Sequence, residues 1–86
     1  MNTPIHIGEI IKNHLTEQKR SVEWLATLLG CDASALRKSL KKYYISTDLL
    51  FRISEFLEID FFAFFTKKLS EKIKNGQYLP DRNVDY

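Results

Sequence analysis

The chain has 86 residues, 44% of them hydrophobic and 28% charged, which is typical of one small globular domain. Its net charge of +2 permits nucleic-acid binding without requiring it. A single cysteine rules out an intrachain disulfide, no apolar run approaches the ~20 residues that span a bilayer, and no signal-peptide pattern opens the chain, so we expect a cytoplasmic protein that does not enter membranes.

Apolar residues recur with a helical period almost throughout the chain, which predicts an all-α fold. A first helix is expected over residues 6–18, and a second begins after Ser21, whose hydroxyl suits an N-cap. Gly30 should end the second helix, because glycine enters the left-handed conformation without a Cβ penalty. The inward stripes of these two helices are Ile7, Ile10, Ile11, Leu15, Leu25, Ala26, Leu28 and Leu29.

Asp32 is expected to cap a third helix, about residues 33–43, and Thr47 is expected to cap a fourth. The third helix would face inward with Leu36 and Leu40. The inward positions of the fourth would be Leu49, Leu50, Ile53, Phe56 and Leu57.

A fifth helix should open at Asp60, where apolar residues step by four: Phe61, Phe65, Leu69 and Ile73. The four phenylalanines between 61 and 65 are expected to be mainly core. They cannot all point one way, so at least one should be exposed unless a partner covers it. We therefore predict a domain over residues 1–74 and a loosely ordered tail over 75–86.

The second and third helices are joined by a tight turn at residues 30–32. Ala26 is small where the two helices would cross, and Cys31 occupies an apolar position, so we expect its thiol to be buried. Such a pair braces the second of its helices so that its outer face protrudes, which a DNA major groove accepts.

Several features of this segment match one known pattern in kind and spacing. They are Ser21, Leu25-Ala26, Leu29-Gly30, Leu36, and the run Leu49-Leu50-x-x-Ile53-x-x-Phe56-Leu57. Residues 7 to about 65 thus resemble the lambda-repressor-like, or XRE-type, helix-turn-helix domain. The resemblance implies a five-helix fold with a helix-turn-helix formed by helices 2 and 3, which commonly dimerises on two-fold-related sites in double-stranded DNA.

The outer face of the third helix is the expected DNA-reading surface. Residues 37–42 hold four cations, and residues 33–47 contain no acid. The expected base contacts are Ala33, Ser34, Arg37 and Lys38. The expected phosphate contacts are Ser21, Lys41, Lys42 and Tyr43. A solvated polar face is the alternative interpretation, with Ser21 only a cap and one of Tyr43 and Tyr44 packed on the fourth helix.

A second hypothesis is a protein-interaction module, or an antitoxin-like partner protein, on the same scaffold. Val22 replaces the glutamine that the resembled family often carries, and the third helix opens with short side chains. The expected homodimer or partner interface is Trp24, Phe62, Phe64 and Leu69. Trp24 could instead pack on the first helix. No catalytic motif or metal-ligand spacing is present, so we expect neither an enzyme nor a cofactor.

Overall fold

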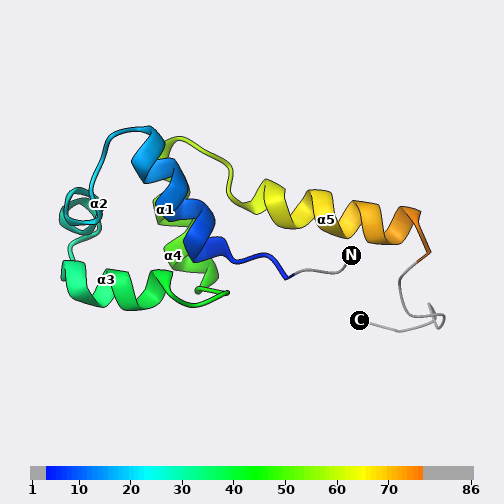
Figure 1. The fold of residues 1–86 in the computed structure, drawn as a ribbon, viewed down its shortest axis with the longest axis horizontal. Coiled ribbons are helices and arrows are strands. Elements are labelled where there is room, and N and C mark those ends of the chain that lie inside the picture. Colours follow the sequence, from blue (N-terminus) through cyan, green and yellow to red (C-terminus); the bar gives the residue numbers. More distant parts are fainter. Residues whose placement is uncertain (1–3, 77–86) are drawn as a thin grey trace.

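The computed structural model describes residues 4–76, and all the regular secondary structure in that range is helical. The helices are α1 (Ile7–Glu17), α2 (Val22–Leu29), α3 (Ala33–Leu40), α4 (Thr47–Leu57) and α5 (Phe62–Lys74) (Figure 1). The predicted all-α class with five helices is confirmed. Of the predicted tail, Asn75 ends α5 and Gly76 follows it, whereas residues 77–86 lie outside the described range.

Side-chain caps explain where three helices begin. His6 Nδ1 accepts the Glu9 N–H at the start of α1, at 3.1 Å. Ser21 Oγ accepts the Trp24 N–H at 3.0 Å, as predicted for α2. The cap of α4 is Ser46 rather than Thr47, because the Ser46 side chain is the one that accepts a helix N–H. Thr47 is instead the first residue of that helix.

The ends of α2, α3 and α5 differ in part from the predictions. Gly30 ends α2 in the left-handed conformation, with φ of 74°, as expected. Asp32 occupies the N-cap of α3, but its side chain makes no capping hydrogen bond. This helix ends at Leu40, three residues before the predicted end. Asp60 does support the start of α5, because its Oδ1 accepts the Phe62 N–H at 3.0 Å.

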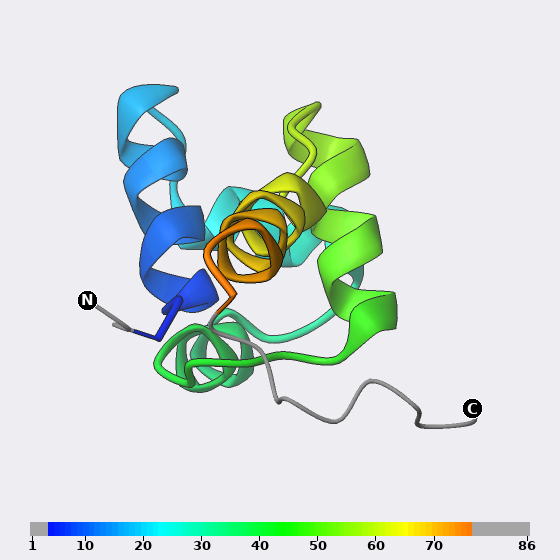
Figure 2. The same ribbon diagram turned by 90° about the vertical axis from the view of Figure 1, so that its right-hand side faces the viewer.

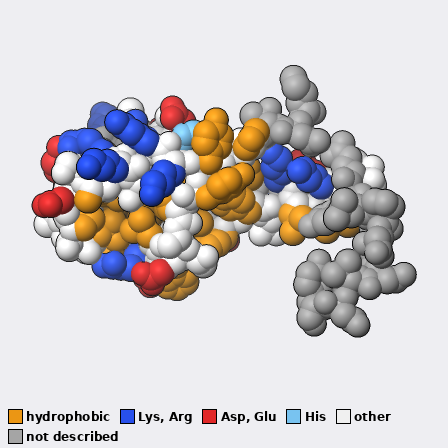
Figure 3. All heavy atoms as spheres, turned by 90° about the horizontal axis from the view of Figure 1, so that it is seen from below, with side chains coloured by type: hydrophobic (Ala, Val, Ile, Leu, Met, Phe, Trp, Pro, Cys, Tyr) orange, Lys and Arg blue, Asp and Glu red, His pale blue; other side chains and the backbone are white. Residues whose placement is uncertain are grey.

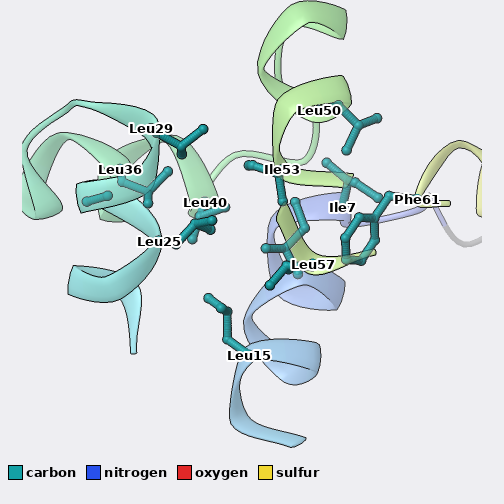
Figure 4. Packing of buried hydrophobic residues seen from close by; sticks show 12 residues of the cluster. Ile7, Leu15, Leu25, Leu29, Leu36, Leu40, Leu50, Ile53, Leu57 and Phe61 are labelled. Carbon is teal, nitrogen blue, oxygen red and sulfur yellow. The ribbon is translucent and has the colours of Figure 1, made fainter. Parts of the chain in front are cut away.

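The core is formed by α1 to α4 together with Phe61. Figure 4 shows Leu25, Leu36 and Leu40 converging between α2 and α3, while Ile7 and Phe61 lie toward α4. The buried hydrophobic residues are Ile7, Ile11, Leu15, Leu25, Ala26, Leu29, Leu36, Leu40, Leu50, Ile53, Leu57 and Phe61.

Three predictions about burial are wrong. Cys31 is exposed, since it lies in the turn outside both helices. Leu28 and Phe56 are 40% and 38% exposed, because each lies on the outer side of its helix's buried stripe. The stripe of α5 is not core either, as no residue of this helix is buried.

Helix α5 extends away from the body formed by the other four helices (Figure 1). Seen along its axis, it projects from the region between α1 and α4 (Figure 2). The Cα radius of gyration is 15.4 Å, whereas a compact domain of this length would have about 11–12 Å. The phenylalanine cluster is thus core only at Phe61, because beyond its first turn α5 has no neighbouring helix to cover it.

Helices α1 and α3 approach each other closely at Gly8. This residue is buried, and a Cβ there would stand 2.5 Å from the carbonyl carbon of Leu40. The Ile7 N–H also donates to the Tyr43 carbonyl, at 3.1 Å. The start of α1 therefore fixes the position of the end of α3.

Candidate nucleic-acid interface

Helix α3 is held against the body along one side only. It packs against α1 and α2 through Leu36 and Leu40, which are 2% and 1% exposed. Helix α2 is in turn tied to α4, because Arg52 Nη2 donates to the Leu29 carbonyl at 2.9 Å. The opposite side of α3 therefore faces outward, supported by α1 and α2.

The outward side of α3 carries polar and basic side chains. Ser34, Arg37, Lys38 and Lys41 follow one another at spacings of three and four residues, and all four are exposed. Lys42 is exposed just beyond the helix. The structure therefore brings most of the predicted contact residues onto one face. Figure 3, which views the molecule from the side of α3, shows Lys and Arg side chains gathered over this end of the body.

Ala33 differs from the other predicted base contacts. It is half-buried and packs against the core cluster, so its methyl group lies at the edge of the face. Ala35 is exposed nearby and adds only another methyl group. The polar atoms available on this face therefore come from Ser34 and the three cations.

Arg37 is paired within the molecule. Its guanidinium donates a hydrogen bond to the carboxylate of Glu23, which lies on α2. That hydrogen bond is the largest of the effects that lower the pKa of the Glu23 carboxyl below its usual range. Both side chains are about half exposed or more, at 49% and 61%, so solvent screens the pair and a stronger anion can displace Glu23.

The predicted phosphate contacts Ser21 and Tyr43 already have partners. Ser21 Oγ is engaged as the cap of α2, which leaves its hydroxyl hydrogen to donate elsewhere. The Tyr43 ring lies against the His6 ring, tilted by 35° at a centroid distance of 4.3 Å, and Tyr43 is 49% exposed. The ring of Tyr44 lies against Phe65 of α5.

The four residues predicted for a dimer or partner interface do not form one patch. Trp24 is half-buried against the core, and the Arg20 guanidinium covers its ring at 4.0 Å. On α5, Phe62 also packs on the core, whereas Phe64 and Leu69 are 36% and 44% exposed. Trp24 and the residues of α5 thus belong to separate surfaces.

Three residues of this region were missed from the sequence. Glu23 restrains Arg37, Gly8 sets the approach of α1 to α3, and Arg20 covers Trp24. Glu23 and Arg37 are fourteen positions apart on different helices, so no periodicity within one helix links them. A glycine in the first turn of a helix was the only available sign of the close approach at Gly8.

Within residues 4–76, no group of three or more His, Cys, Asp or Glu side chains is placed to hold a metal ion. None of the helices in this range has the length and apolar character needed to cross a membrane. Comparison of the chain with protein-family models, with curated proteins and with solved structures gave no match.

Proposed function

We propose that this chain binds double-stranded DNA in a sequence-dependent manner, as a small transcriptional regulator. Helices α2 and α3 would act as a helix-turn-helix, with α3 as the recognition helix. The observation that carries the proposal is the basic outer face of α3, supported from behind by the buried Leu36 and Leu40. The resemblance to lambda-repressor-like domains supports it independently through the spacing from Ser21 to Leu36.

The mode of contact follows from the positions of these side chains. The major groove admits one α-helix, so Ser34 and Lys38 would face base edges near the start and middle of α3. Lys41, Lys42 and Tyr43 would lie along the phosphate backbone and fix the register. Arg37 would exchange Glu23 for a phosphate or a guanine, at little cost because the existing ion pair is exposed.

We further propose that two copies bind adjacent half-sites. The two α3 helices would then enter successive major grooves about 34–36 Å apart on one face of the duplex. Selection of bound duplexes from a random pool, at two salt concentrations, tests this directly. An enriched two-fold-symmetric site is the expected result.

Two matched substitutions separate specific contact from net charge. Lys38→Ala should weaken duplex binding by about tenfold and relax the preference at one base pair. Lys67→Ala removes the same charge from α5 and should leave binding nearly unchanged, because Lys67 lies on the helix that extends away from the body. No duplex binding at low salt, or equal losses for the two variants, would overturn the proposal.

A further inference from the structure

An open groove lies where α5 leaves the body. Two adjoining pockets, of about 280 and 220 Å³, share Tyr44 and Phe65, whose ring centroids are 6.5 Å apart. The first pocket is lined by Pro4, Ile5, Tyr44, Phe65, Lys68 and Lys72. The second continues between Phe62 and the start of α4, with Ile45 just before that helix and Leu50 in its first turn. We call the two together the α5 groove.

The lining of the α5 groove is apolar at one end and basic at the other. It contains no acidic residue, while Lys68 and Lys72 border the end on α5 with half-buried side chains. Lysine stems that lie along apolar surface keep their ammonium groups at its edge. The apolar strip continues along the helix with Leu69 and Ile73, which are 44% and 46% exposed. The complementary ligand therefore has an apolar face and carboxylates beside it.

The openness of the groove favours a chain segment over a small molecule. Tyr44, which both pockets share, is 62% exposed, so the groove is open to solvent along this side. Small-molecule sites are usually closed enough to bury about 70–90% of the surface of their ligand. A helix that lays an apolar face into such a groove uses anchors spaced three and four residues apart. Phe65, Leu69 and Ile73 present apolar surface at every fourth residue of α5, which is one of these spacings.

A second copy of the chain is a poor occupant, because α5 carries four lysines and a single acid, Glu71. At 100° per residue, Lys68 and Lys72 lie on one edge of the apolar strip, and Thr66 and Ser70 lie on the other. Two antiparallel copies would place the lysine edges against each other. Two parallel copies would set each lysine edge against the neutral edge and gain no ion pair.

We propose that the α5 groove binds an acidic amphipathic helix of a partner protein. The apolar side chains of that helix would pack between Tyr44, Phe65 and Leu69, and a carboxylate at its edge would pair with Lys72. A concave groove suits a helix better than the flat surface of a bilayer. This interaction does not require DNA binding, because the groove shares no residue with the outer face of α3.

The probe is a labelled amphipathic peptide of about 16 residues, long enough to form four helical turns, with leucines on one face and glutamates on its edges. A second peptide carries lysine in place of every glutamate. Fluorescence anisotropy with the whole chain should show binding of the acidic peptide, weakened by salt, and none of the basic one. Lys72→Glu should weaken acidic-peptide binding by about tenfold and permit binding of the basic peptide.

The control variant is Lys67→Glu, which makes the same charge change on the opposite side of α5 and should leave binding unchanged. Phe65→Ala should also weaken binding of the acidic peptide while a cooperative urea-unfolding transition, followed by circular dichroism, persists and shows that the body is still folded. Equal binding of the two peptides, no binding of either, or equal losses for the two lysine variants would overturn the proposal. So would stronger binding to vesicles containing phosphatidylserine, or self-association in sedimentation equilibrium that Leu69→Glu abolishes.

Discussion

Replacement of Gly8 by alanine tests the close approach of α1 to α3. A Cβ at this position would stand 2.5 Å from the Leu40 carbonyl carbon and 2.8 Å from its Cα, and closer still to the carbonyl oxygen. Favourable contacts between carbon atoms need about 3.5–4.0 Å. The atoms in the way belong to the main chain of α3, so no side-chain rotation relieves the clash. The two helices must separate by at least about 1 Å, against the close packing of the core.

The magnitude follows from two opposing effects. Overpacking of a well-packed interior costs about 1–3 kcal/mol, and here it also disturbs Ile7 and Ile11, which are fully buried. Alanine recovers up to about 1 kcal/mol through its higher helix propensity, and less than that in a first turn. We therefore expect a loss of about 2 kcal/mol in the free energy of unfolding. For a domain of this size, that lowers Tm by roughly 10 °C.

Urea unfolding followed by circular dichroism, and by the fluorescence of the single tryptophan, measures this loss. Gly30→Ala is the matched control, because Gly30 has φ of +74° but no atom within 4 Å of its would-be Cβ. That variant should lose only the cost of a left-handed alanine, about 1 kcal/mol. If Gly8→Ala is as stable as the parent chain, or no less stable than Gly30→Ala, the argument from helix approach is wrong.

Four further predictions follow from three side chains. Glu58 ends α4 in the left-handed conformation, with φ of 56°, so Glu58→Gly should raise the free energy of unfolding by about 1 kcal/mol in urea titrations; a loss would contradict this reading. Glu23→Gln should raise duplex affinity by about fivefold, since it releases Arg37 and removes a negative charge beside the basic face; unchanged binding in a retardation assay would count against it. Because Arg37 lowers the pKa of Glu23, the ion pair stabilises the fold at pH values above the pKa of Glu23 in the unfolded chain, and this stabilisation is lost as the pH falls through the lowered pKa. Glu23→Gln lacks the ion pair at every pH, so its Tm should fall less steeply with decreasing pH than the Tm of the parent chain. Phe61→Ala should cost about 3–5 kcal/mol and abolish most of the cooperative thermal transition, whereas Phe51→Ala, at a residue 56% exposed, should change stability by less than about 0.5 kcal/mol.

The helices of the body were predictable because the spacing of their apolar residues and the residues at their ends indicate the buried side and the limits of each helix. Leu36 and Leu40 mark the buried side of α3, and Gly30 marks the end of α2. The same logic fails on α5, where Leu69 has the spacing of a core residue but is exposed. An amphipathic pattern identifies the apolar face of a helix without identifying what covers that face.

The candidate site was predictable only for residues that act on their own helix. The exposed positions of Ser34 and Lys38 follow from the period of α3. The restraint of Arg37 by Glu23 depends on how two helices cross, and no local pattern encodes that distance. The prediction that Cys31 is buried is wrong for a similar reason. The direction of a side chain in a turn depends on the path of the backbone, and the apolar period of the neighbouring helices does not indicate it.

The attachment of α5 by its first turn also affects its dynamics. Isolated helices shorter than about 12–15 residues are marginal in water, and α5 has only 13 residues and no buried side chain. Its distal amides should therefore exchange with deuterium through local opening, while the amides of α1 and α4 exchange only when the body unfolds. The chain would then contain two cooperative units of unequal stability. A ligand held by the weaker unit would be detected as slower exchange there, before any change in the melting of the body.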